Sequence, residues 1–235
     1  MITNERASSL LKKEKYNFYD LVEIMDILRG ERGCPWDAEQ THESIRKNFI
    51  EETYEVIEAI DAKDTKLLQE ELGDVMLQVV FHAQMEKEAG SFDIDDVANE
   101  VCAKLIHRHP HVFGDGDADT PDEVLKAWET IKNQEKSRVT LYEKLKSIPP
   151  MTPALMRAQK VSTKSGKYKN CEGSQEIADQ ILAEAQYIAD QNNEDLEKNV
   201  GNLLFLITAL CGKEDIDAEK ALFDKTNTFI EEYKS

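Results

Sequence analysis

Apolar residues recur at every third or fourth position along most of this chain, and only 10 glycines and 6 prolines interrupt the pattern in 235 residues. This period matches one face of an α-helix and differs from the alternation that is typical of a β-strand. The sequence therefore predicts an all-α fold with little or no sheet. The length allows either one large domain or two domains of roughly 100 residues each.

Five helices are predicted in the first part of the chain from their start and stop signals. Asp64 and Asp93 are expected N-caps, Gly90 is an expected C-cap, and Thr120 followed by Pro121 is typical of a helix start. The predicted helices cover residues 19–28, 42–62, 65–89, 94–108 and 121–136. The intervening segments GERGCPWDAEQ (30–40) and HPHVFGDGDAD (109–119) are predicted to be loops.

The segment SIPPMTPA, residues 147–154, contains half of the prolines and breaks the helical pattern. It is the predicted domain boundary, which divides the chain into domains 1–145 and 155–235 joined by a linker at 146–154. In the second domain, GNLLFLITAL (201–210) resembles GDVMLQVVFHA (73–83) in its order of glycine, polar residue and apolar run. This similarity suggests a tandem duplication.

The charge balance restricts the possible partners. The chain has 29 basic and 47 acidic residues, a formal net charge of -18, which disfavours nucleic acid and anionic membranes as partners. A polyanionic substrate would need divalent cations and local Lys or Arg residues to reverse the field. The first residues, MITNERASSLLKKEKYNF, lack the apolar core expected of a signal peptide, and the sequence has no uncharged apolar run of about 20 residues. Cys34, Cys102, Cys171 and Cys211 form no CxxC pair and are expected to be reduced, which predicts a cytoplasmic protein.

Two groups of acidic residues carry the strongest chemical signal. Glu51, Glu52 and Glu55 lie on the helix at 42–62, and Glu71 and Asp74 lie on the next helix. Residues three apart share a helix face, and the short connection favours antiparallel packing, so the two groups are expected to meet. Carboxylates without His or Cys suit Mg²⁺ or Mn²⁺. An ordinary solvated acidic face is the alternative; the apolar run after Asp74 places these residues at the edge of the core and favours a metal site.

Basic and aromatic residues suited to a nucleotide follow on the next helices. Lys104 and Arg108 are four residues apart and share a helix face, where they are candidates for phosphate binding. Trp128 and Lys132 have the same spacing, and Trp128 is a candidate platform for stacking on a base, with Lys132 near the phosphates or the base edge. Surface cations and a core tryptophan are the alternatives.

Other site classes have less support. His107, His109 and His111 cluster around Pro110, but no cysteine accompanies them, and termination of a helix explains them as well as zinc does. The sequence has no P-loop, no dinucleotide fingerprint and no serine-hydrolase elbow.

Taken together, these segments resemble the MazG family of all-α nucleoside triphosphate pyrophosphohydrolases. The family pattern EExxE followed by ExxD is met by Glu51, Glu52, Glu55, Glu71 and Asp74. The segments that are close to the family are GCPWD (33–37), EETYEVIEAI (51–60), ELGD (71–74), RHPHVFGD (108–115), WETIK (128–132) and PALMRAQKV (153–161). Six motifs in the same order make the resemblance specific.

The resemblance implies a fold, an activity and roles for the residues named above. It implies tandem helical-bundle repeats with a four-helix-type core, a homodimer, and Mg²⁺-dependent cleavage of NTPs or dNTPs into a nucleoside monophosphate and pyrophosphate, with Mn²⁺ as a possible substitute. The implied Mg²⁺ ligands are Glu52, Glu55, Glu71 and Asp74. Glu51 would orient the attacking water or a ligand, Lys104, Arg108 and Lys132 would bind the substrate, and Trp128 would stack on its base.

The second repeat departs from this pattern. Glu184 aligns with Glu52, but Tyr187, Asn199 and Asn202 stand where the other three metal ligands would be. The second repeat is therefore predicted to be catalytically silent and to serve packing, dimerisation or regulation.

Two further alternatives remain open at the level of sequence. The same acidic ligands would serve a non-catalytic protein that binds nucleotide or metal for regulation. A ferritin-like di-iron protein would need Glu-x-x-His on two helices, and only Glu39 and His42 have that spacing.

Overall fold

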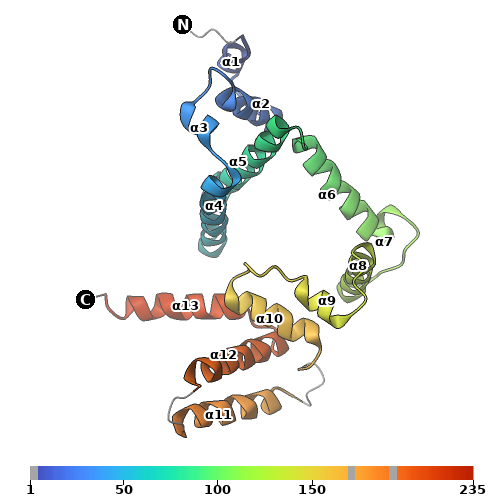
Figure 1. Cartoon of the computed structure of the whole chain (residues 1–235), viewed down its shortest axis with the longest axis vertical. Helices are drawn as coiled ribbons and strands as arrows, with labels where there is room; N and C mark the ends of the chain where they lie inside the picture. The colour runs from blue at the N-terminus through green and yellow to red at the C-terminus, as the bar shows by residue number, and fades with distance from the viewer. Residues whose placement is uncertain (1–4, 169–172, 191–194, 235) are drawn as a thin grey trace. The chain divides into compact units, whose positions relative to one another are not determined.

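A computed structural model of the chain describes residues 5–168, 173–190 and 195–234. In these residues the secondary structure is entirely helical, with helices α1 to α13 and no β-strand (Figure 1). The prediction of an all-α fold is therefore confirmed. Cys171 lies outside the described residues, and Cys34, Cys102 and Cys211 are free thiols. Among the described helices, none is both long enough and apolar enough to cross a membrane.

The chain divides into two compact units, residues 1–117 and 118–235, which we describe separately. This division lies before α8 and not in the Pro-rich segment at 146–154. Lys164 of α10 pairs with Glu129 of α8, with 2.5 Å between Nζ and Oε1, and α9 contacts α10. These contacts assign α8 and α9 to the second unit. The repeat limits predicted from sequence, 1–145 and 155–235, stay a prediction.

The first unit is built around the longest helix. Its helices are α1 (Glu5–Leu10), α2 (Phe18–Arg29), α3 (Pro35–Glu39), α4 (His42–Ala62), α5 (Thr65–Ala89), α6 (Ile94–Arg108) and α7 (Pro110–Phe113). Helix α5 contacts α2, α4 and α6. Its inner face supplies most of the buried core cluster, whose members are Met25, Ile45, Val80, Phe81 and Met85. Helix α5 therefore positions the other helices of this unit.

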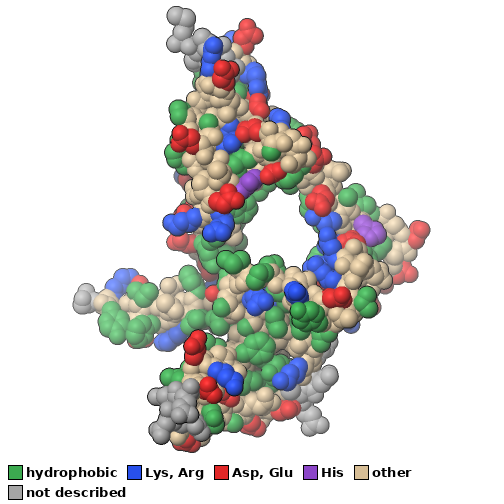
Figure 2. All heavy atoms as spheres, viewed as in Figure 1, with side chains coloured by type: hydrophobic (Ala, Val, Ile, Leu, Met, Phe, Trp, Pro, Cys, Tyr) green, Lys and Arg blue, Asp and Glu red, His purple; other side chains and the backbone are tan. Residues whose placement is uncertain are grey.

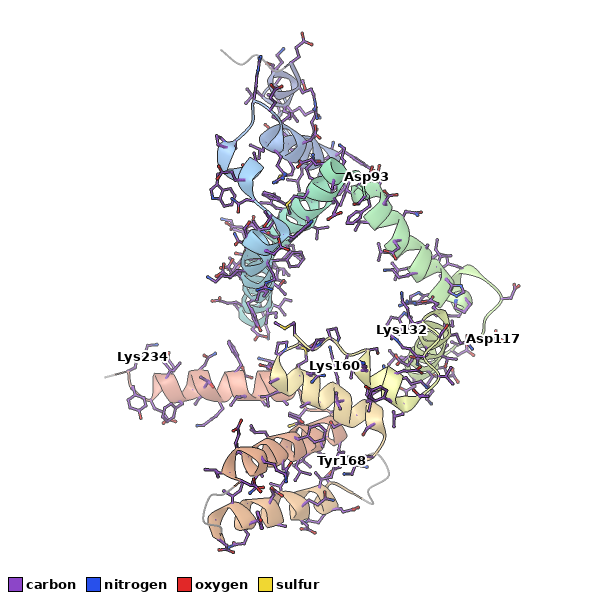
Figure 3. All side chains as sticks on the ribbon, in the orientation of Figure 1. Asp93, Asp117, Lys132, Lys160, Tyr168 and Lys234 are labelled. Atoms are coloured by element: carbon purple, nitrogen blue, oxygen red, sulfur yellow. The ribbon has the colours of Figure 1, made fainter. Side chains whose placement is uncertain are left out.

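Side-chain caps set the helix boundaries. Asp64 accepts hydrogen bonds from the backbone N–H groups of Lys66 and Leu67, and Gly90 ends α5 in the left-handed conformation at φ 75°. Asp93 caps α6 at its junction with α5 (Figure 3). Only two residues, Lys63 and Asp64, join α4 to α5, which makes these two helices antiparallel neighbours (Figure 1).

Two short helices lie in segments that the residue pattern predicts as loops. Helices α3 and α7 begin at Pro35 and Pro110, and each proline occupies the first helical position. Proline has a preset φ there and loses no hydrogen bond, because the first N–H groups of a helix have no partner within it. The loop predictions are therefore wrong for residues 35–39 and 110–113, whereas residues 30–34 and 114–119 contain no helix, as predicted.

The second unit has its own core. Its helices are α8 (Pro121–Glu135), α9 (Leu141–Lys146), α10 (Ala154–Ser165), α11 (Ser174–Asp190), α12 (Leu196–Lys213) and α13 (Ala218–Glu231). Helix α12 contacts α10, α11 and α13. Tyr168, Ile177 and Ala209 form the buried cluster, with Phe205 packed against it. Figure 3 places Tyr168 just beyond α10.

Arg29, the last residue of α2, ties three helices of the first unit together. Its side chain is only 7% exposed, and it donates hydrogen bonds to both carboxylate oxygens of Glu88 on α5. It also donates to the backbone carbonyls of Asp37 and Gln40 and lies over the ring of Phe81 at 5.3 Å from the centroid. The segment that contains α3 is therefore held against α2 and α5.

We expect Arg29→Met to lower the free energy of unfolding by about 2–3 kcal/mol, because the substitution removes the charged partner of Glu88, which keeps a hydrogen bond from Gln84, and takes a donor from two carbonyls. The matched variant Arg6→Met removes a 51% exposed arginine that pairs with Glu23 and Asp26. It should cost at most about 1 kcal/mol, as exposed ion pairs do. Urea unfolding followed by circular dichroism measures both values. Equal losses would contradict the role given to Arg29.

Candidate metal centre

The antiparallel packing of α4 and α5 brings acidic side chains from both helices together. Carboxylate oxygens of Glu52, Glu55 and Glu71 all lie within 4.8 Å of one another. Glu71 is 9% exposed, Glu52 is half-buried and Glu55 is exposed. In the part of the chain that the structure describes, these three form the one group of His, Cys, Asp or Glu side chains with such spacing. We call Glu52, Glu55 and Glu71 the carboxylate cluster.

Asp74 lies at the edge of the carboxylate cluster. It follows Glu71 by three residues on α5, so the two side chains share a helix face, and Asp74 is half-buried. Its negative charge helps to raise the pKa of both Glu52 and Glu71. Asp74 is therefore close enough to interact electrostatically with the cluster, although it is outside the group within 4.8 Å.

Burial and mutual repulsion make the cluster costly to ionise. Loss of water contact is the main cause of the raised pKa of Glu52, and the charges of Glu55 and Asp74 add to it. The pKa of Glu71 is raised by the same causes in the same order. Like charges at close range favour the protonated form, and a bound cation removes the same repulsion. The arrangement is suited to a hard divalent cation with oxygen ligands.

Glu51 points to a different partner. Its carboxylate lies 2.8 Å from the ammonium group of Lys47, and both side chains are more than half exposed. Glu51 is not a member of the carboxylate cluster. A role in orienting water stays a prediction and would require Glu51 to leave Lys47.

Helix α6 carries the two candidate phosphate ligands. Arg108 is 8% exposed and Lys104, one turn earlier, is half-buried. A buried guanidinium presents five donors in a fixed plane, which suits phosphate oxygens. Contact of Lys104 and Arg108 with phosphate stays a prediction.

Comparison with known proteins identifies the family. The model of the MazG nucleotide pyrophosphohydrolase domain matches residues 40–113, which include α4, α5 and α6. A Thermotoga maritima relative named nucleoside triphosphate pyrophosphohydrolase/pyrophosphatase MazG is 42% identical over 95% of this chain and 87% of its own length. The chain belongs to the MazG family. It is thus a member of an enzyme family of nucleoside triphosphate pyrophosphohydrolases, as its motifs indicate.

Other relatives agree with this assignment. An Escherichia coli K12 protein named nucleoside triphosphate pyrophosphohydrolase is 40% identical over 91% of this chain and 84% of its own length. A Mycolicibacterium smegmatis protein of the same name is 44% identical, over 60% of this chain and 44% of its own length. The first two similarities extend well beyond the matched domain and include most of both compact units.

The remaining site residues of this MazG protein lie in the other compact unit. Trp128 and Lys132 are on α8, where Figure 3 labels Lys132. The Lys132 ammonium lies 4.6 Å from the centroid of the Trp128 ring, a cation–π contact. Both side chains are half-buried. Their predicted contact with the base and phosphates stays a prediction.

The alternative metal sites do not form in the described residues. The group of potential metal ligands found there consists of three glutamates and contains no histidine. Neither the Glu39 and His42 pair nor the three histidines near Pro110 form a metal site in these residues. His109 is the C-cap of α6, with its Nδ1 2.6 Å from the carbonyl of Leu105. Helix termination accounts for this histidine segment.

One polar network was not predicted from the sequence. His42 Nδ1 lies 2.7 Å from His82 Nδ1, and His42 Nε2 lies 2.7 Å from Glu86 Oε1. A signal was present, because Asp74, Gln78, His82 and Glu86 are spaced by four residues and therefore form a polar stripe on α5. Such a stripe inside a helix pair implies a polar partner on α4, but it does not say which residue.

We expect Glu52→Gln to raise the thermal midpoint of the metal-free protein by about 2 °C at neutral pH. The folded pKa of Glu52 lies above its unfolded value, so its contribution to stability is present in acid and is lost as the pH rises through the folded pKa. The difference should shrink as the pH is lowered to about 4, where the wild-type carboxylate is also protonated.

Scanning calorimetry across this pH range measures the effect, and Glu58→Gln, an exposed glutamate of the same helix, is the matched control. Addition of Mg²⁺ should raise the wild-type midpoint more than that of Glu52→Gln. A lower midpoint for the metal-free variant at neutral pH would contradict the repulsion.

Proposed function

We propose that this MazG protein hydrolyses nucleoside triphosphates, NTPs or dNTPs, to nucleoside monophosphate and pyrophosphate, with Mg²⁺ bound at the carboxylate cluster. The observation that supports this most directly is the gathering of Glu52, Glu55 and Glu71 within 4.8 Å in the segment that matches the family domain. The names of the Thermotoga maritima and Escherichia coli relatives give the same reaction class.

The donor set fits the proposed ion. Glu52, Glu55, Glu71 and Asp74 would hold Mg²⁺, since carboxylate oxygens are its preferred protein ligands, and Mn²⁺ would bind in its place. When bound, the ion polarises a phosphoryl group and lowers the pKa of water. These carboxylates would orient the triphosphate through the ion, and the burial of Glu71 would limit competing water around it.

The proposed reaction is attack of water on the α-phosphorus, with cleavage of its bond to the bridging oxygen. The pyrophosphate leaves with that oxygen, and the proton of the water passes to a carboxylate, for which Glu51 is the candidate. Lys104 and Arg108 would neutralise phosphate oxygens, and Trp128 with Lys132 would hold the base and phosphates.

We assign the activity to the first repeat, 1–145, and propose that residues 155–235 form a degenerate repeat after the linker 146–154. In the second unit Asn202 donates a hydrogen bond to Glu184, with 3.3 Å between Nδ2 and Oε1, and Asn199 is 8% exposed. These residues align with Asp74, Glu52 and Glu71. An amide that donates a hydrogen bond to a carboxylate is an attractive pair, whereas two carboxylates at these positions would repel each other and would need a cation between them.

The proposed homodimer is supported by an apolar face of the α4 and α5 hairpin. Ile50, Tyr54 and Ile57 are 45–54% exposed and share one face of α4. Leu72 and Met76, one turn apart on α5, are 49% and 44% exposed. Exposed apolar side chains that share a helix face are typical of a protein interface. Hydrophobic side chains of α13 also gather at the surface of the second unit (Figure 2).

We further propose a cytoplasmic location without nucleic-acid or membrane partners. The free thiols Cys34, Cys102 and Cys211 suit a reducing compartment, and a net charge of -18 repels other polyanions.

The second candidate function is a regulatory protein that binds nucleotide and metal without turnover. Incubation of the full chain with Mg²⁺ and each NTP, with detection of pyrophosphate and identification of the monophosphate, separates the two functions. Binding without pyrophosphate release would support regulation and contradict the enzyme.

We expect Glu52→Gln and Asp74→Asn to lower kcat/KM for pyrophosphate release by about 100-fold or more, because each variant removes a ligand of an ion worth several kcal/mol to the transition state. Glu184→Gln, at the aligned position of the second repeat, should stay within about twofold of wild type. A loss for Glu184→Gln equal to that of Glu52→Gln would place the activity in the other repeat.

We expect Ile57→Asp to shift the protein from dimer to monomer at micromolar concentration, because a carboxylate in an apolar interface is costly to desolvate. Sedimentation velocity measures the shift, with Glu58→Gln as the neighbouring control. A wild-type protein that sediments as a monomer would contradict the dimer.

A further inference from the structure

A histidine pair joins α4 and α5 at the end of the hairpin away from its turn. The imidazoles of His42 and His82 are almost coplanar, at 3°, with their Nδ1 atoms 2.7 Å apart. The other nitrogen of His42 lies 2.7 Å from the Glu86 carboxylate. Residues 40 positions apart in the sequence are thus connected by a direct polar contact within the helix interface.

This contact depends on the number of protons that the pair holds. Two Nδ1 atoms at hydrogen-bond distance need one hydrogen between them, so one ring donates and the other accepts. The carboxylate of Glu86 accepts a hydrogen bond from Nε2 of His42. A second proton would place a hydrogen on both facing Nδ1 atoms and a positive charge on both rings. The hydrogen bond between the two imidazole rings is then lost, and the rings repel each other.

The surroundings favour release of the second proton. Burial lowers the pKa of His82, and the neighbouring His42 lowers it further. The charged groups that face the pair are Glu86 on α5 and Glu43 and Arg46 on α4.

A groove gives the solvent access to one side of His82. Its volume is about 430 Å³, and its walls beside His82 include Phe49, whose ring is 5.9 Å away, and the apolar Phe92 and Val97. Helix α6 contributes no charged side chain to this groove. The protonation state of His82 can therefore follow the pH.

The histidine pair and the carboxylate cluster lie on the same two helices. Glu52 follows His42 by ten residues, about 15 Å along α4, and Asp74 precedes His82 by eight residues, about 12 Å along α5. A slip of one residue between the helices moves the ligands by about 1.5 Å. Mg²⁺ and Mn²⁺ require ligand distances defined far more closely than that.

We propose that the contact between His42 and His82 sets the register of α4 against α5, and so the spacing of the metal ligands, and that a second proton on the pair weakens metal binding. His42 and His82 are positioning residues, since they do not touch the cluster. The inference rests on the proposed metal site and adds a specific origin for its pH dependence.

The test uses the full chain and Mn²⁺ alone, with binding measured by titration calorimetry between pH 6 and 8. His82→Phe keeps a ring that can pack against Phe49 but cannot form the hydrogen bond to His42. It should lower the affinity for Mn²⁺ about tenfold at pH 8, because residues that support metal ligands commonly have effects of this size. His82→Asn keeps a polar group near the position of Nδ1 and does not titrate. It should bind within about threefold of wild type at pH 8.

The pH profile separates positioning from a merely structural role. Protonation of the carboxylates weakens metal binding in all three proteins, so only the excess loss in wild type at the acid end of the range, below the ordinary histidine pKa of about 6.5, belongs to the histidine pair. His82→Asn should lack this excess. His107→Gln, an exposed histidine on α6, is the matched control and should retain the wild-type profile.

Each outcome bears on a different claim. Parallel pH profiles for wild type and His82→Asn would overturn the proposal, as would wild-type affinity in His82→Phe at pH 8. If circular dichroism shows His82→Phe to be unfolded, the profile of His82→Asn decides alone. If wild type binds Mn²⁺ and these variants bind it in the same way, the histidine proposal fails but the proposed metal site does not. No binding of Mn²⁺ by wild type at any pH would overturn the metal site and this inference together.

Discussion

The mutual repulsion of carboxylates between α4 and α5 is the constraint on which the rest of the first unit depends. Glu52, Glu55 and Glu71 lie within 4.8 Å of one another, and the pKa values of Glu52 and Glu71 are raised. Helices with such an interface would separate unless other contacts held them. The two-residue connection at one end, the apolar core and the histidine pair at the other end provide that support.

The chain therefore concentrates an unfavourable interaction where a cation is expected to act. Natural enzymes commonly give up stability at a functional site and recover it elsewhere. Here the recovery comes from the buried face of α5 and from Arg29, which connects α2 and α5 and holds the segment of α3. In the second unit Asn202 donates a hydrogen bond to Glu184, and under the repeat alignment proposed above these two residues correspond to Asp74 and Glu52.

Local signals predicted the five helices expected in the first part of the chain, together with Glu52, Glu55 and Glu71, whose carboxylates the structure brings together. The helices at residues 42–62, 65–89 and 94–108 agree with the structure, because their caps are short-range features that a sequence states directly. The missed helices α3 and α7 are only a turn long, and a single proline at the first position outweighed the loop composition around it. The ligand roles and the repeat limits remain predictions.

The sequence by itself determined which residues share a helix face, because the helical period places Glu52 with Glu55 and Glu71 with Asp74 regardless of what surrounds them. Only the tertiary structure decided which faces meet and in what register. It brought Glu55 to Glu71, paired His42 with His82, and left Glu51 with Lys47. The physical reason is that helix periodicity is local, whereas the register between two helices depends on the sum of all contacts along their interface.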